Sequence, residues 1–222
     1  MATYQQLQDD ISGWLNRRDI APRIPGWVAM VETDIAETLR ARCMVTSGVQ
    51  PIDAAYITLP ADFAQMESIR DATSGQILEL KDEWSGDWTE PRLNGWVDGA
   101  VVGGNWGPCR AYRLVHDCIE LLPHPWIPDP PDPAWVPQSI LMGWYAKPRP
   151  LLLPSDTNAV LEALYAVYFF GVCKYGAMFE LDDDRATQAD AAFQQAVTRA
   201  NLHKQMSDYG GAPLRSEMAC SF

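Results

Sequence analysis

The hydrophobic period of the chain changes twice along its length, and this change constrains the fold more than any other feature. Residues 1–44 and 155–208 place apolar side chains at the three- and four-residue spacing of amphipathic helices. Residues 45–154 instead contain short apolar and β-branched runs, interrupted by Gly, Pro, Asn and Asp, as strands and turns do. The order of helices, strands and helices predicts an α+β fold, with a β domain inserted into a discontinuous helical domain.

Each helical segment is expected to form two helices, so that together they predict a four-helix α-bundle. The first helix follows Thr3, a favourable N-cap, and is expected to end near Arg18. The second begins at Pro25, since proline suits the first turn of a helix, and runs to about Met44.

The third helix, over residues 156–179, is apolar on nearly all sides, which predicts a central position in the bundle. Gly171 and Gly176 are expected to admit close neighbours there. A turn containing three consecutive acids leads to the fourth helix, which is expected to end near Met206. Residues 209–222 contain Gly-Gly and Pro without a sustained period and predict an extended C-terminal tail.

The inserted segment predicts a small antiparallel β-sandwich or barrel-like domain, because about six strands suffice for one. The expected strands cover residues 54–59, 66–70, 76–81, 111–117, 118–123 and 139–147.

A proline-rich run occupies residues 123–137, between two of these expected strands. The simplest interpretation is a stiff loop between neighbouring strands, whose Trp126 and Trp135 either fold back on the sheet or contact another subunit or the tail. The P-x-x-P spacing of Pro128 and Pro131 leaves open a second interpretation, a ligand for a proline-binding domain.

The charge balance argues against tight nucleic-acid binding. The chain has 17 Lys and Arg against 29 Asp and Glu, a formal net charge of −12, and it contains no basic block. A protein that neutralises many phosphates needs a basic surface. The most apolar segment, over residues 159–173, contains Glu162 and is too short to span a membrane.

No motif indicates catalysis, a cofactor or a metal site. The three His residues lie on different expected elements, without the spacing that metal ions select. His116 and Asp117 are adjacent in an expected strand and would point to opposite faces of the sheet. Asp182, Asp183 and Asp184 are explained most simply as an N-terminal cap of the fourth helix, and secondarily as acids that line a channel.

Several segments resemble, in order and spacing, the adaptor or head-tail connector proteins of tailed bacteriophages, especially those that join portal to tail in short-tailed phages. The opening "ATYQQLQDDISGWLNRRDIAPRIPGWVAMVETDI" is similar to that family's first two helices and the turn between them, and "YITLPADFAQMESI" to its "LP-DF" strand. The segments "RAYRLVHDCIELLPHP" and "LMGWYAKPRPL" resemble its later strands. The segment "LYAVYFFGVCKYGAMFELDDDRATQADAAFQQAV" resembles its long helix, acidic turn and final helix.

The resemblance implies a structural virion protein at the head-tail junction, present in the host cytoplasm during assembly. It implies a ring of subunits, twelve if it matches the portal, docked between the portal and a tail or nozzle protein. DNA would pass through the ring without sequence-specific binding. The tail after residue 208 would dock on the portal, with Leu214, Arg215, Met218 and Phe222 as anchors.

Two alternative functions remain open at the level of sequence. One is a virion-associated cell-wall hydrolase that uses a pair of carboxylates, because separation in space and not in sequence decides whether two acids can cooperate. The other is a module that binds a host domain through its proline-rich loop.

Overall fold

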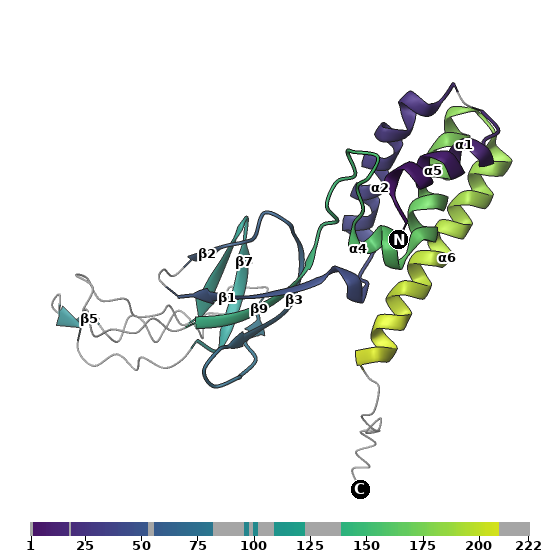
Figure 1. The fold of residues 1–222 in the computed structure, drawn as a ribbon. Helices are drawn as coiled ribbons and strands as arrows, with labels where there is room; N and C mark the ends of the chain where they lie inside the picture. The colour runs from purple at the N-terminus through teal and green to yellow at the C-terminus, as the bar shows by residue number, and fades with distance from the viewer. Residues whose placement is uncertain are drawn as a thin grey trace, which may run out of the picture. The chain divides into compact units, whose positions relative to one another are not determined.

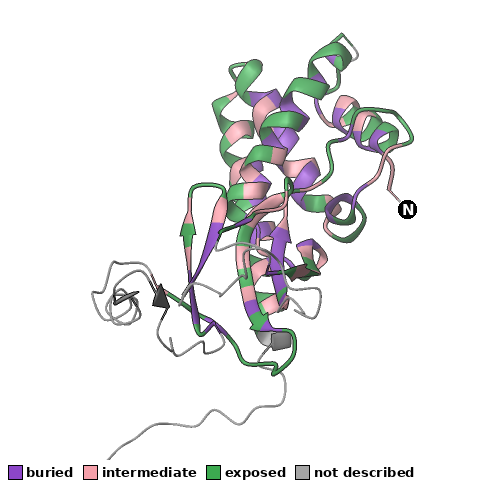
Figure 2. Ribbon diagram, turned by 90° about the vertical axis from the view of Figure 1, so that its left-hand side faces the viewer, coloured by how far each residue is buried: buried purple, intermediate pink, exposed green. Residues whose placement is uncertain are grey.

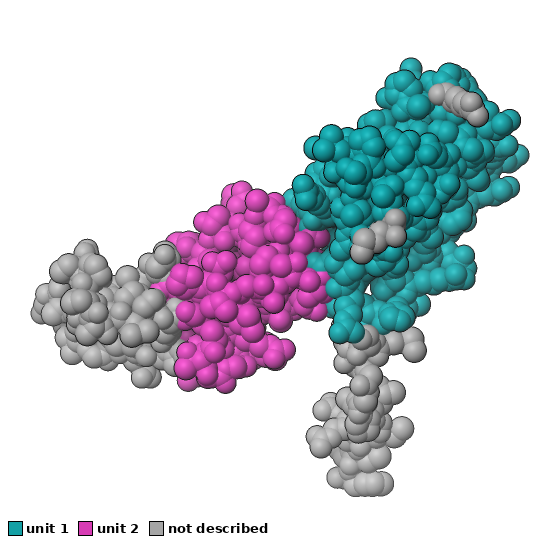
Figure 3. Space-filling view, viewed as in Figure 1, with its two compact units in different colours: residues 1–44, 147–222 teal, residues 45–146 magenta. Residues whose placement is uncertain are grey.

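A computed structural model describes residues 2–17, 19–52, 56–81, 96–97, 100–101, 109–122 and 139–208. Its fold is α+β, as predicted (Figure 1). The chain divides into two compact units, a helical unit of residues 1–44 and 147–222 and a β unit of residues 45–146 (Figure 3).

The helical unit contains five α-helices and two short 3-10 helices among the described residues. The α-helices are α1 (Tyr4–Trp14), α2 (Ile24–Thr38), α4 (Ala159–Ala163), α5 (Tyr165–Phe179) and α6 (Asp183–Asp208), and the 3-10 helices are η1 (Ala21–Arg23) and η2 (Arg42–Met44). The single helix predicted over 156–179 is therefore wrong in part. The helix is divided at Leu164, whose backbone leaves the helical region (φ −135°, ψ 50°).

Local capping explains where the first two helices begin and end. The side chain of Thr3 accepts the N–H of Gln6, which confirms the predicted N-cap of α1. The second helix ends at Thr38, well before the predicted Met44. Asn201 of α6 accounts for this, because its side chain accepts the N–H of Arg40 (2.7 Å) and donates to the carbonyl of Thr38 (3.1 Å).

Helix α5 packs against α1, α2 and α6, which explains why it is apolar on several sides. The other helices bury one face and expose the other (Figure 2). A Cβ added at Gly171 would lie 2.9 Å from Cγ1 of Val31, and one added at Gly176 would lie 2.7 Å from Cδ1 of Leu15. The prediction that both glycines admit close neighbours is confirmed.

The described residues of the β unit form nine short strands. They are β1 (Val45–Pro51), β2 (Tyr56–Thr58), β3 (Phe63–Asp71), β4 (Glu79–Leu80), β5 (Trp96–Val97), β6 (Ala100–Val101), β7 (Ala111–Val115), β8 (Cys118–Leu122) and β9 (Ser139–Ala146). Each of the six predicted segments contains a strand, although the segment 76–81 retains only two strand residues. The predictions missed β1, because Gly48 and Pro51 are not typical strand residues. They also missed the β5–β6 pair.

Two open sheets form the β unit, together with the small β5–β6 pair. One sheet has the order β1-β9-β3 and the other β2-β8-β7-β4, and no closed barrel exists among the described strands. All pairs are antiparallel except β4–β7, which is parallel. Since β8 and β9 belong to different sheets, the proline-rich run connects two sheets and not neighbouring strands, which corrects the prediction.

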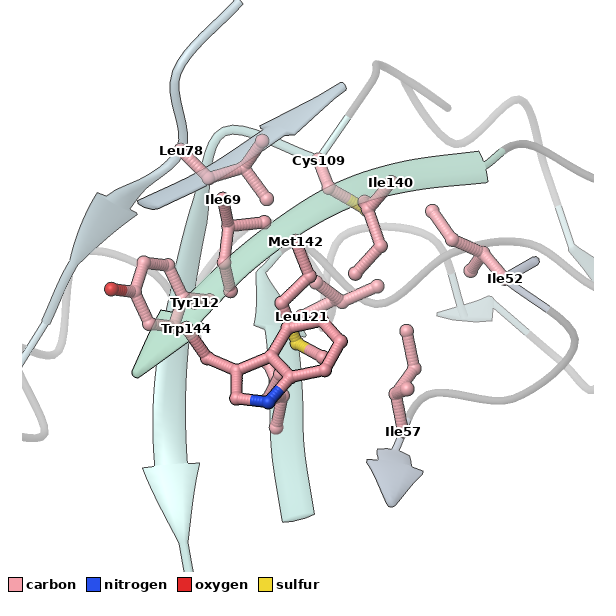
Figure 4. Packing of buried hydrophobic residues seen from close by; sticks show 11 residues of the cluster. Ile52, Ile57, Ile69, Leu78, Cys109, Tyr112, Leu121, Ile140, Met142 and Trp144 are labelled. Atoms are coloured by element: carbon pink, nitrogen blue, oxygen red, sulfur yellow. The ribbon is translucent and has the colours of Figure 1, made fainter. Parts of the chain in front are cut away.

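Apolar side chains from both sheets form one core, which includes Ile69, Leu78, Leu121, Met142 and Trp144 (Figure 4). The indole of Trp144 also donates to the carboxylate of Asp62 (3.2 Å), so its polar atom has a partner at the edge of the core.

The hairpin between β7 and β8 turns at His116 and Asp117, which are exposed and pair with no strand. Placing these two residues in a strand was therefore wrong. His116 has a positive φ of 54°, because a two-residue hairpin needs a left-handed backbone at its turn.

Candidate functional site

Only part of the sequence-predicted site lies within the described residues. The interface candidates Trp126 and Trp135 lie outside them, as do all four anchors of the C-terminal tail, Leu214, Arg215, Met218 and Phe222. The three acids Asp182, Asp183 and Asp184 are described and lie where α6 begins.

Two other surfaces of the helical unit combine exposed apolar side chains with a fixed backbone. We call residues 147–158, which enter the unit ahead of α4, the connector. We call residues 178–184, where α5 turns into α6, the corner.

The connector presents two leucines to solvent. Leu152 is 78% exposed and Leu153 62% exposed. The carboxylate of Asp156 accepts the N–H groups of both residues, at 2.9 and 2.7 Å. These two bonds, together with a nearby Arg149, lower the pKa of Asp156. The leucines therefore project from a turn that its own carboxylate closes.

A polar network inside the helical unit anchors the connector on its other side. Asn158 accepts the N–H of Leu161 (2.8 Å) and caps α4, while its amide donates to the carbonyl of Arg149 and to the hydroxyl of Tyr168, both at 2.8 Å. Both Asn158 and Tyr168 are buried. The network thus ties the beginning and the end of the connector to α5.

Glu32 of α2 completes this network. Its carboxylate accepts the N–H of Leu151 (3.0 Å) and the hydroxyl of Tyr168 (3.4 Å). Burial raises the pKa of Glu32, and the two hydrogen bonds oppose that rise in part. Burial also raises the pKa of the Tyr168 phenol, so this tyrosine remains neutral and donates its proton.

The corner ends α5 in a Schellman motif. The N–H of Asp182 donates to the carbonyl of Ala177 (3.1 Å), and the N–H of Leu181 donates to that of Met178 (3.2 Å). This motif needs a left-handed residue, normally glycine, and here Leu181 takes that position with a φ of 59°. Leu181 is nevertheless 87% exposed.

Two more apolar side chains lie beside Leu181. Met178 and Phe179 are both exposed, and Phe179 packs against Trp27, with Arg23 over its ring at 4.4 Å. The 3-10 helix η1 and the first turn of α2 therefore support one side of the corner.

Asp182 closes the corner by capping α6, since its carboxylate accepts the N–H of Arg185 (3.1 Å). Asp183 and Asp184 lie in the first turn of α6 and are exposed. Carboxylates at this position interact favourably with the positive end of the helix dipole.

The described carboxylates with little exposure have structural partners. Glu120 is 4% exposed and pairs with Arg113, and Asp71 is 8% exposed and accepts the N–H of Thr73 and both donors of Ser74. These bonds, those of Ser74 first, lower the pKa of Asp71, opposite to what a general acid requires. No observation on these residues favours a glycosidase-like pair.

The described part of the chain offers neither a metal-binding cluster nor a membrane-spanning helix. No cluster of His, Cys, Asp and Glu there could hold a metal ion. No described helix is both long enough and apolar enough to span a membrane.

Sequence reasoning missed both the connector and the corner as surfaces. The three leucines of residues 151–153 were assigned only to the end of the β domain, yet Leu151 is buried while the next two are exposed. At the corner, the signal available was a leucine between two acids directly after a helix, where a glycine is the usual residue.

Comparison with known proteins identifies the family. The sequence model of the SU10 adaptor protein family matches residues 2–217, nearly the whole chain. No curated protein matches. Because the match covers both helical segments and the inserted β unit, the resemblance to phage adaptors is confirmed, and the chain belongs to the SU10 adaptor protein family of bacteriophage structural proteins.

Proposed function

We propose that the protein forms a ring at the head-tail junction of a virion, between the portal and a tail or nozzle protein. The observation that carries this proposal is the family match over residues 2–217, because an adaptor family implies portal and tail partners. Twelve copies would match a twelvefold portal.

The charge of the chain suits a ring through which DNA passes. Each copy carries a net charge of −12, so a dodecamer would carry a large negative charge overall. Such a ring would repel phosphates and let the duplex move without being held. Of the three acids considered for a channel, Asp182 is engaged in capping α6, and Asp183 and Asp184 are exposed in the first turn of that helix.

The C-terminal tail supplies the portal contact in this proposal, with Leu214, Arg215, Met218 and Phe222 as anchors. Helix α6 ends at Asp208, before the tail begins. Deleting residues 212–222 is therefore expected to leave the helical unit folded and to abolish portal binding. Sedimentation of the truncated and full-length chains with purified portal tests this, and unchanged co-sedimentation of the truncated chain would contradict it.

Trp126 and Trp135 are proposed to contact a neighbouring subunit or the tail protein. Aromatic side chains are enriched where proteins associate, which supports this role for an apolar loop between two sheets. Replacing both with Ser is expected to weaken assembly of the ring or attachment of the tail protein, but not portal binding by a single copy.

The role is proposed to be structural and not enzymatic. A turbidity assay on peptidoglycan tests this point, with the full-length protein at the concentrations used for assembly. Clearing of the suspension that disappears in a Glu32→Gln or Glu120→Gln variant would favour the hydrolase instead.

A further inference from the structure

The connector and the corner carry complementary chemistry. The connector has two exposed leucines, Leu152 and Leu153, beside two exposed cations, Lys147 and Arg149. The corner has exposed Leu181, Met178 and Phe179 beside the exposed acids Asp183 and Asp184. Each surface also carries charge of the other sign, but those groups already have partners. At the corner Arg17 and Arg185 pair with Glu180 and Asp182, and Arg23 lies over Phe179. In the connector Asp156 accepts two backbone N–H groups of its own turn.

The two surfaces lie at opposite ends of α1. At its start, the N–H of Tyr4 donates to the carbonyl of Asp156 and that of Gln5 to the carbonyl of Pro154. At its other end, Leu15 contacts Gly176 and Arg17 pairs with Glu180 (3.5 Å). Figure 1 shows α4 and the N-terminus near one end of α1 and the turn from α5 to α6 near the other. An 11-residue helix separates them, a length of about 16 Å.

Within its own chain, Leu181 contributes little to the stability of the corner. A left-handed backbone is unfavourable for leucine because its Cβ approaches the following carbonyl oxygen. The side chain recovers little by packing, since 87% of it is exposed. The same motif ends α1, where the N–H of Arg17 donates to the carbonyl of Ser12, and there Asn16 takes the left-handed position (φ 53°). Asparagine tolerates that conformation well.

We propose that the corner of one copy docks on the connector of the next copy, with Leu181 inserted between Leu152 and Leu153 and with Asp183 and Asp184 facing Lys147 and Arg149. This inference rests on the proposed ring. Copies related by a rotation need two different surfaces that fit each other, and a ring closes only if successive rotations return to the first copy. A leucine in an unfavourable backbone conformation then has a function in contact with a neighbour.

A glycine at position 181 separates docking from folding. Leu181→Gly is expected to raise the Tm of the unassembled chain by roughly 2 °C, because glycine removes the steric conflict. It is expected to weaken self-association about tenfold to hundredfold, the effect of losing one buried leucine. Asn16→Gly is the matched control and leaves self-association unchanged. A lower Tm together with unchanged association would show that Leu181 only stabilises its own chain and would overturn the proposal.

Charge reversal tests the pairing of the two surfaces. Lys147→Glu with Arg149→Glu makes both surfaces acidic, and Asp183→Lys with Asp184→Lys makes both basic. Each double variant is expected to lose ring formation in sedimentation experiments, alone and with portal. Mixing the two variants is expected to restore it, because every contact between unlike copies then joins opposite charges.

Each result of this experiment bears on the proposal. Loss without restoration on mixing overturns the pairing of the two surfaces. Rings formed by each variant as well as by the wild-type chain overturn the docking surface while leaving the adaptor function standing. Failure of the wild-type chain to form rings or to bind portal overturns the proposed function and this inference together. Loss of portal binding with intact self-association would assign the corner to the portal and also overturn the proposal.

Discussion

The connector exposes leucines at the start of α1 and the corner exposes one at its other end, but different groups hold them in place. Side chains fix the connector, through the carboxylates of Glu32 and Asp156 and the amide of Asn158. Backbone hydrogen bonds fix the corner, with Asp182 as the one side chain that caps the next helix. The connector should therefore respond more strongly than the corner to single substitutions, and it contains a contact with a carboxylate, Glu32, whose pKa burial raises.

The largest effect is expected from Asn158→Ala. The substitution removes the cap of α4 and leaves the hydroxyl of Tyr168 short of a partner in a buried site, and the carbonyl of Arg149 short of one in a partly buried site. A lost cap costs about 1 kcal/mol and each unsatisfied buried group about 1–3 kcal/mol, so the helical unit should lose roughly 3 kcal/mol of unfolding free energy. Urea denaturation measures the loss.

Hydrogen exchange locates the effect, and Asn201→Ala serves as its matched control. In Asn158→Ala, the amides of Leu151, Leu152 and Leu153 should exchange faster. In Asn201→Ala, the affected amides should be those near Arg40, which Asn201 binds. Equal protection of the connector in wild type and Asn158→Ala would mean that the buried network does not hold it.

A smaller effect is expected at the corner from Asp182→Ala. The substitution removes the cap of α6 but leaves the backbone bonds that end α5, so the loss should be about 1 kcal/mol. Asp183→Ala is the control, since it removes only a first-turn charge, worth about 0.3–1 kcal/mol. Thermal unfolding of both variants measures the difference. A loss from Asp182→Ala as large as that from Asn158→Ala would remove the contrast between the two surfaces.

The contrast also explains how much of the molecule could be predicted from its sequence. Sequence patterns gave the α+β class and the cap at Thr3, because each depends on residues near in sequence. Gly171 and Gly176 indicated close approaches, but not their partners Val31 and Leu15, which lie far away in the sequence. Sequence patterns failed where distant residues decide the outcome. Asn201 ends α2 from more than 160 residues away, and no local signal near Thr38 indicates it.

The same limit applies to the surfaces. Sequence patterns cannot distinguish the buried Leu151 from its exposed neighbours, because Glu32, on another helix, accepts the N–H that fixes the turn. The acids 182–184 were recognised as helix-capping candidates from their position alone. What Asp183 and Asp184 face in an assembly depends on a neighbouring copy, which no pattern within one chain encodes.

The smallest effect, and the one that separates the connector from the corner most directly, is a dependence of stability on pH through Glu32. Burial raises the pKa of Glu32 in the folded chain above its value in the unfolded chain. The folded state therefore binds the proton more tightly, and stability falls as the pH rises from the ordinary pKa of glutamate through the raised one.

Glu32→Gln keeps an acceptor for the N–H of Leu151 but cannot titrate, so the wild type should lose stability relative to this variant across that window. Urea denaturation of both proteins from pH 4 to pH 8 measures the difference in their free energies of unfolding. This range begins near the ordinary pKa of glutamate. Parallel curves for wild type and Glu32→Gln would show that the carboxylate at the connector acts only as a hydrogen-bond acceptor, and that the connector and the corner differ in geometry but not in their response to protons.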